Sequence, residues 1–225
     1  MTDALGQLLA SGVGVALSPI PVIAVILMLT TARGRVTGVA FMLGWLVGLS
    51  AATGIVLLLA NGSDETGSTA ADGAHIATLV VGLLFLALAS LQWRRRPKGH
   101  EPPELPAWMA GIDGFGAPKC FALGALLSGV NPKNLAMAVS AGVALAETGS
   151  TGGATVIGAA IFVIVGSVTV AGPVVGSLIA PARAGRALAE AKTWLADHNS
   201  TIMIVLFLVL GATKTGEGLA SLLHG

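Results

Sequence analysis

The sequence predicts an all-α integral membrane protein, and two observations support this prediction. Of its 225 residues, 54% are hydrophobic and only 10% are charged, whereas a soluble domain carries about 25% charged residues. In addition, six apolar stretches are each near or above the roughly 20 residues with which a helix crosses the hydrocarbon core. They lie at residues 5–31, 36–61, 74–93, 120–146, 154–180 and 201–223. We therefore expect six transmembrane helices.

The first apolar stretch is interrupted by Ser18-Pro19-Ile20-Pro21. A proline inside a helix removes a backbone hydrogen bond and kinks or breaks the helix, so this stretch predicts a broken first helix with free carbonyl groups. Irregular backbone is not tolerated against lipid, and the break must be buried in protein or line a water-filled cavity. The alternative is a proline kink that only shapes the helix bundle.

The second and third stretches complete an N-terminal three-helix repeat over residues 1–93. The second is rich in glycine and contains Gly44 and Gly48 at a spacing that lets membrane helices approach closely. We interpret this pair as packing within the bundle rather than as a dimer face. The proline-rich segment 94–119 begins with three arginines, and we expect it to form a basic cytoplasmic loop.

The fourth stretch is broken by Asn131-Pro132-Lys133-Asn134, and Lys133 is the only charged residue between 120 and 146. An intramembrane ammonium is costly, faces a protein interior or a wet cavity, and marks a functional site by default. Its central position argues against snorkelling to an interface. The amide and ammonium groups suit a carboxylate, a phosphate or a sulfate, or the carbonyl ends of the opposite half-helix. A purely structural pairing of Lys133 is the alternative.

The fifth and sixth stretches complete a C-terminal three-helix repeat over residues 120–225. Between them, apolar and charged residues alternate over residues 183–199, which predicts an amphipathic helix at the cytoplasmic interface. In the sixth stretch, Lys214 and Glu217 are three residues apart and can pair on one helix face. We interpret that pair as structural rather than as a gate.

Three helices in each half make the second half an inverted copy of the first, with the broken helix first in each. Interrupted hydrophobic segments in corresponding positions of two halves indicate the binding site of a secondary transporter. The predicted substrate-binding residues are Ser18, Pro19, Pro21, Asn131, Pro132, Lys133 and Asn134.

The basic residues predict the topology. Lysine and arginine occur in the connections at 32–35, 94–119 and 181–200, whereas the connections at 62–73 and 147–153 contain none. Because basic loops remain in the cytoplasm, we expect a multi-pass plasma-membrane protein with both termini extracytoplasmic. The three arginines at 94–96 are also a candidate contact for anionic lipid head groups.

Other classes of protein are disfavoured. A net charge of +1 gives no nucleic-acid footprint. Cys120 is the only cysteine, so neither an intrachain disulfide nor a cysteine metal cluster can form. No histidine or carboxylate lies in the middle of an apolar stretch. We expect no enzymatic activity, metal or cofactor; the expected partners are membrane lipids, a lipid or small-molecule substrate, and a second copy in a homodimer.

The proline motif at 18–21, the Asn131-Pro132-Lys133 motif, the glycine-rich second helix and the basic central loop resemble the LysE superfamily of small exporters. Residues 124–135, GALLSGVNPKNL, resemble most the GAP family, which includes sulfolipid-addressing and peptidoglycolipid-addressing proteins. The resemblance implies export from the cytoplasm, of glycolipids or their precursors in the GAP family and of amino acids or cations in its relatives. Pro-Ile-Pro at 19–21 departs from the Pro-Gly-Pro of the amino-acid exporters.

Residues and resemblance together predict a transmembrane secondary exporter of an amphipathic, glycolipid-type or other small substrate. Two alternatives remain open. One is an exporter of a small solute such as an amino acid or a cation. The other is a non-transporting membrane subunit of an envelope-lipid pathway.

Overall fold

The computed structural model describes residues 2–61, 68–94, 96, 106–149 and 152–224, and this part of the chain contains helices and no strand. The all-α prediction is therefore confirmed. The elements are α1 (Thr2–Ala16), α2 (Pro19–Leu29), α3 (Gly34–Asn61), α4 (Ser68–Arg94), the 3-10 helix η1 (Ala107–Gly114), α5 (Ala117–Gly129), α6 (Pro132–Glu147), α7 (Gly153–Ile179) and α8 (Pro181–His224).

Both proline motifs end one helix and begin another. The first apolar stretch forms α1 and α2, which are bent by 54°. Ser18 is the N-cap of α2 and Pro19 is its first residue; in the same way Asn131 is the N-cap of α6 and Pro132 its first residue. Proline suits this position because its missing N–H would have no helical partner there and its φ is already helical. The two predicted breaks are thus helix starts of the same kind.

Three helices of the described chain, α3, α7 and α8, are long and apolar enough to cross a membrane, and the bent pair α1–α2 counts as a fourth. The helices α5 and α6 have 13 and 16 residues and are individually shorter than a crossing. Exposed apolar side chains such as Leu58 and Ile157, at 73% and 64% exposure, suit contact with lipid. By length and composition, three or four helices of the described chain are therefore candidates for the six predicted crossings.

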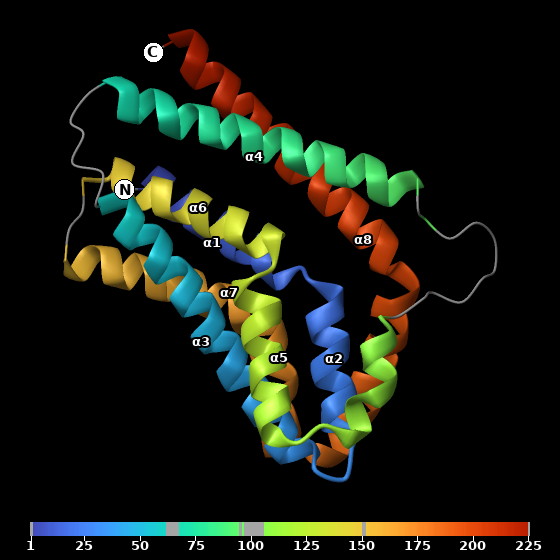
Figure 1. Cartoon of the computed structure of the whole chain (residues 1–225). Coiled ribbons are helices and arrows are strands. Elements are labelled where there is room, and N and C mark those ends of the chain that lie inside the picture. The colour runs from blue at the N-terminus through green and yellow to red at the C-terminus, as the bar shows by residue number, and fades with distance from the viewer. Residues whose placement is uncertain (1, 62–67, 95, 97–105, 150–151, 225) are drawn as a thin grey trace.

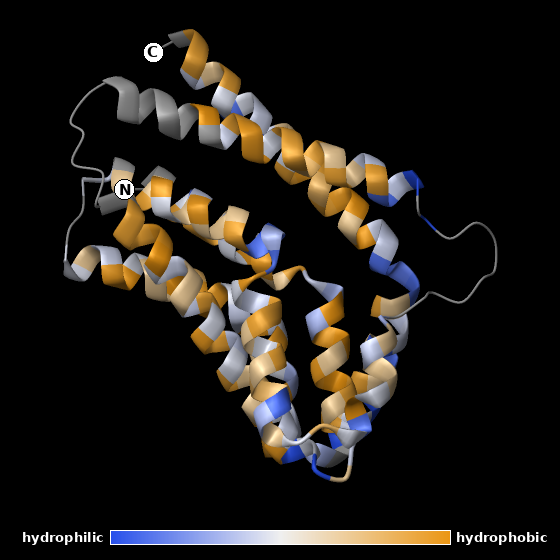
Figure 2. Ribbon diagram, in the orientation of Figure 1, coloured by the Kyte–Doolittle hydropathy of each residue, from blue (hydrophilic) through white to orange (hydrophobic). Residues whose placement is uncertain are grey.

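The helices pack in a pattern that nearly repeats when α1–α4 are exchanged with α5–α8. Helix α3 contacts α5 and α6, and the corresponding helix α7 contacts α1 and α2. Helix α4 lies along α8 (Figure 1), and α3 contacts α7. Exchanging the two halves leaves each of these two pairs unchanged. The labelled N- and C-termini lie on the same side of the molecule in Figure 1. In Figure 2, hydrophobic residues run along most helices, while hydrophilic residues gather at the α2–α3 turn.

Glycines allow α3 and α5 to pack with their backbones in close contact. A Cβ atom at Gly44 would overlap the carbonyl oxygen of Phe121, and one at Gly48 would overlap that of Ala125. From the other side, a Cβ at Gly124 would overlap the carbonyl oxygen of Phe41. The interpretation of Gly44 and Gly48 as packing within the bundle is confirmed. This contact fixes α5 and, with it, the position of the second break.

The structure corrects one expected element. Residues 183–199 are helical, as predicted, but they continue without interruption into the last apolar stretch, so α8 is a single helix of 44 residues. The reason is that residues 186–210 contain no proline or glycine, and nothing in that range ends the helix. Within the segment 94–119, Pro118 and Lys119 belong to the first turn of α5.

Candidate functional site

The side chain of Lys133 connects the two breaks. Its ammonium donates hydrogen bonds to the carbonyl oxygen of Gly14 at 2.6 Å and to Oγ of Ser18 at 2.5 Å. It also lies 3.5 Å from the carbonyl oxygen of Val15 and 3.4 Å from that of Leu17. The residue is only 3% exposed. A cation from the second break is therefore held inside the protein by backbone acceptors of the first break.

The acceptors at the first break exist because α1 ends there. The last four carbonyl groups of a helix have no intrahelical partner, and the negative end of the helix dipole favours a cation. In the part of the chain that the structure describes, Lys133 forms no ion pair; the one ion pair found there joins Lys214 and Glu217. Carbonyl groups and one hydroxyl thus take the place of a carboxylate counter-ion.

Ser18 both accepts and donates a hydrogen bond. Its hydroxyl accepts from Lys133 and donates to the carbonyl oxygen of Val15 at 2.9 Å. Although Ser18 occupies the N-cap position of α2, its side chain makes no capping hydrogen bond. It is directed back to the end of α1 instead, and it is 6% exposed. Ser18 therefore ties the ammonium to the broken backbone of its own half.

Thr169 on α7 completes the first break and was not predicted from the sequence. Its hydroxyl donates a hydrogen bond of 2.8 Å to the carbonyl oxygen of Ala16. Together with the contacts of Lys133, this bond provides a partner for each carbonyl group from Gly14 to Leu17. The available signal was a hydroxyl residue inside the glycine-rich fifth apolar stretch, but its direction could not be known without the helix packing.

Two asparagines organise the second break. Oδ1 of Asn131 accepts a hydrogen bond of 3.0 Å from the backbone N–H of Lys133 and so caps α6. Nδ2 of Asn134 donates to the carbonyl oxygens of Leu127 and Ser128 at the end of α5, at 3.2 and 3.1 Å. Oδ1 of Asn134 is buried and has no partner among the described residues. These side chains hold α5 and α6 together and set the direction of Lys133.

The structure brings two of the predicted site residues, Ser18 and Lys133, into direct contact. Pro19 and Pro21 are buried in the first turn of α2, and Pro132 is exposed at the first turn of α6. We call the contact of Lys133 with Ser18 and the end of α1 the Lys133 junction. Chemically, it combines an ammonium with two helix N-termini, the features that bind anions in proteins. In the conformation observed, however, the donors of the ammonium are taken by protein acceptors.

A model of one protein family, described as "Sap, sulfolipid-1-addressing protein", matches residues 8–220 of the chain. The match includes both breaks and extends into the last helix. It confirms the resemblance to the sulfolipid-addressing proteins that was drawn from residues 124–135. No curated protein and no solved structure matches the chain.

Proposed function

The chain belongs to the family of sulfolipid-1-addressing proteins, and from this premise we propose that it is a secondary exporter of an amphipathic, glycolipid-type substrate. The observation that carries the proposal is the contact of the Lys133 ammonium with the carbonyl groups that end α1. In transporters built from inverted repeats, substrates bind near the bilayer midplane, where discontinuous helices of the two halves meet. This contact is a meeting of that kind.

The packing of the helices supports an inverted repeat of three plus three crossings. Exchanging the halves maps the contact of α3 with α5 onto that of α7 with α1. In each half the same device, an N-cap residue followed by proline, begins the helix after the break. In this proposal α1–α2 and α5–α6 each cross the membrane as one broken helix. The basic connections lie in the cytoplasm, and both termini lie outside the plasma membrane.

The proposed cycle uses the high cost of a buried ammonium. Removing a charge from water costs several kcal/mol even after relaxation, and no carboxylate of the described residues pairs with Lys133 to offset it. A sulfolipid has an anionic head group, and such a group provides a stronger partner for Lys133 than neutral carbonyls do. When the anion binds Lys133 and Ser18, the contact of α1 with α6 is released and the two halves move. Asn131, Asn134 and the three prolines keep the helix starts in place.

The proposal is tested with purified protein in lipid vesicles that contain a fluorescent sulfated glycolipid. Dithionite added outside quenches only the outer leaflet, so movement of the lipid between leaflets appears as additional quenching. A secondary transporter equilibrates its substrate without an added energy source. The variant to compare is Lys133→Met, and the matched control is Lys119→Met, because Lys119 is exposed in the first turn of α5.

We expect the wild type and Lys119→Met to move the lipid and Lys133→Met to leave the inner leaflet protected. Vesicles loaded with radiolabelled lysine are measured in parallel. Release of the amino acid that depends on Lys133, without movement of the lipid, would favour the small-solute exporter. Movement of neither substrate by folded wild-type protein would favour the non-transporting subunit.

A further inference from the structure

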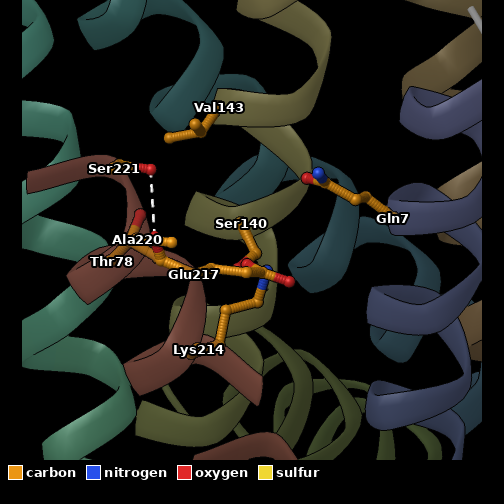
Figure 3. A pocket seen from close by; sticks show the side chains of 8 residues that line it. All are labelled: Gln7, Thr78, Ser140, Val143, Lys214, Glu217, Ala220 and Ser221. Carbon is orange, nitrogen blue, oxygen red and sulfur yellow. Dashed lines mark hydrogen bonds and ion pairs between the residues drawn. The ribbon is translucent and has the colours of Figure 1, made fainter. Parts of the chain in front are cut away.

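A polar cavity of about 350 Å³ lies among α1, α4, α6 and α8, away from the Lys133 junction. Figure 3 shows the side chains around it. Its polar lining consists of Gln7, Thr78, Ser140, Lys214, Glu217 and Ser221. A space of this size is within the range that binds small organic groups, about 300–1,000 Å³. Polar linings inside an apolar bundle are expensive and therefore indicate a function.

The polar groups of this cavity are only partly paired with each other. Lys214 and Glu217 form an ion pair of 2.7 Å, and the lysine is 8% exposed. Ser140 is also 8% exposed, and its hydroxyl has no hydrogen-bond partner among the described residues. In Figure 3 the amide of Gln7 points towards Ser140 and Glu217. The hydroxyl of Ser140 is not one of the fully buried atoms without a partner; it is open to the cavity, where a ligand can bond to it.

The chemistry of the lining selects the kind of ligand. Among the residues that the structure describes around the cavity, the charges of Lys214 and Glu217 cancel, so these residues provide no excess charge with which to hold an anion or a cation. It does offer donors and acceptors together, in the hydroxyl, the amide, the carboxylate and the ammonium. Hydroxyl groups of a ligand can both donate to and accept from such a set. We propose that the cavity binds an uncharged, hydroxyl-rich head group, a sugar or polyol, of an amphipathic molecule.

The cavity and the Lys133 junction lie along the same contact between α1 and α6. Ser140 follows Lys133 by seven residues on α6, and Gln7 precedes Gly14 by seven residues on α1. Seven residues are two helical turns, about 10 Å, and place both members of each pair on one face. The hydrogen bond from Lys133 to the carbonyl oxygen of Gly14 fixes how α1 and α6 are aligned along their contact. The cavity is thus two turns from the junction, towards the chain termini.

Met137 separates the cavity from the junction. It lies between Lys133 and Ser140 on α6, is fully buried, and has its sulfur 2.8 Å from the place of a Cβ at Gly14. The role assigned to the cavity rests on the proposed export function: an anionic group binds at Lys133 and a sugar binds two turns further along the same path. Binding of the sugar itself requires no transport and is measured separately.

The test uses the full chain in lipid nanodiscs that contain no glycoside detergent. The probe is an alkyl glucoside with a photoreactive diazirine next to its head group, and an alkyl phosphate with the same chain and diazirine is the comparison. After illumination, mass spectrometry locates the labelled peptides in wild type, Ser140→Leu and Gln7→Leu. The matched control is Ser50→Leu, because Ser50 lies in an apolar groove between α3 and α7.

We expect the glucoside to label the peptides around Ser140 and Glu217 in wild type and in Ser50→Leu, and the phosphate to label them far less. Labelling should fall about tenfold in Ser140→Leu and in Gln7→Leu, as expected for the loss of about 1.4 kcal/mol of binding. Each variant lies on a different helix, and size-exclusion chromatography verifies that each is folded. Undiminished labelling in both folded variants, or equal labelling by the phosphate, would overturn the inference.

The two proposals can fail independently in these experiments. If Lys133→Met retains glucoside labelling but loses lipid movement, both proposals stand. If wild-type protein binds the glucoside but moves no lipid, the export function fails and the cavity remains a sugar site. If lipid movement is intact and the cavity is not labelled, only the cavity inference fails.

Discussion

The ammonium of Lys133 and the hydroxyl of Ser18 are 2.5 Å apart although 115 residues separate them in the chain. This contact makes one site of the two proline breaks. The first half supplies the acceptors, which are the carbonyl groups of α1 and the hydroxyl of Ser18. The second half supplies the cation of Lys133, and the backbone N–H of Lys133 donates a hydrogen bond to the capping side chain of Asn131. Any movement of one half against the other must therefore break or rebuild this contact.

Lys133 and Ser18 should be energetically coupled. Lys133→Met keeps the apolar stem but leaves buried carbonyls without a donor, so we expect the free energy of unfolding to fall by about 1–3 kcal/mol. Ser18→Ala should cost about 1 kcal/mol. In the double variant the losses should fall short of additivity by about 1 kcal/mol, measured by unfolding in mixed detergent micelles. Losses that add within about 0.5 kcal/mol would show that the two residues do not interact.

The cap of α6 should depend on the side chain of Asn131. Asn131→Ala removes the acceptor for the N–H of Lys133 and should lower the free energy of unfolding by about 1 kcal/mol. Asn131→Ser restores an acceptor at the same position and should recover most of the loss. Equal stability of the alanine and serine variants in thermal unfolding would argue against this cap.

The two glycines Gly44 and Gly54 on α3 should respond oppositely to alanine. At Gly44 the new Cβ would overlap the backbone of Phe121, and we expect a loss of about 1–3 kcal/mol through overpacking. At Gly54 it would meet no described atom within 4 Å, and the better helix propensity of alanine should add up to about 1 kcal/mol. Thermal unfolding of the two variants checks both signs. Equal tolerance at both positions would contradict the close packing of α3 with α5.

Thr169 should contribute a hydrogen bond between helices. Thr169→Val keeps the shape of the side chain and removes the donor to the carbonyl of Ala16. Such bonds in membrane bundles contribute on average about 0.6 kcal/mol and at most about 1.7, so a loss in this range is expected. The control is Thr213→Val, whose hydroxyl bonds to the carbonyl of Val209 within its own helix and should matter less. Identical unfolding curves for the two variants would count against the role of Thr169.

The sequence was most informative where a single residue has a local physical effect. Proline begins a helix and cannot continue one, so the breaks at Pro19 and Pro132 were predicted correctly. The length of the last helix was not predicted correctly. Residues 183–199 are less apolar than the final stretch, but both favour a helix equally, so the change in apolarity does not mark a helix end. Apolar content shows where a helix can meet lipid, whereas its ends depend on caps and breakers.

The candidate site was only half predictable. A buried ammonium in the fourth stretch indicated a site, and the end of the opposite half-helix was among the partners considered for Lys133. The partners it has, the carbonyls of Gly14 and Leu17, are backbone groups that every residue carries, so the sequence could not single them out. Thr169 and Ser140 were missed for a related reason. Hydroxyl residues are common in helices, and only the packing of helices decides which of them face a site.

The central claim, that export requires α1 and α6 to separate at the junction, is tested most directly by locking these helices together. A Cβ at Gly14 would lie 3.5 Å from Cγ of Met137, the place that the sulfur of a cysteine at 137 takes in the same rotamer, and in a disulfide each Cβ lies about 3 Å from the far sulfur. The variant combines Gly14→Cys and Met137→Cys with Cys120→Ala, and the two single-cysteine variants serve as controls. Lipid movement in vesicles is measured before oxidation, after oxidation and after reduction. We predict that movement stops when mass spectrometry shows the disulfide and returns when it is reduced; undiminished movement with the disulfide fully formed would contradict the claim.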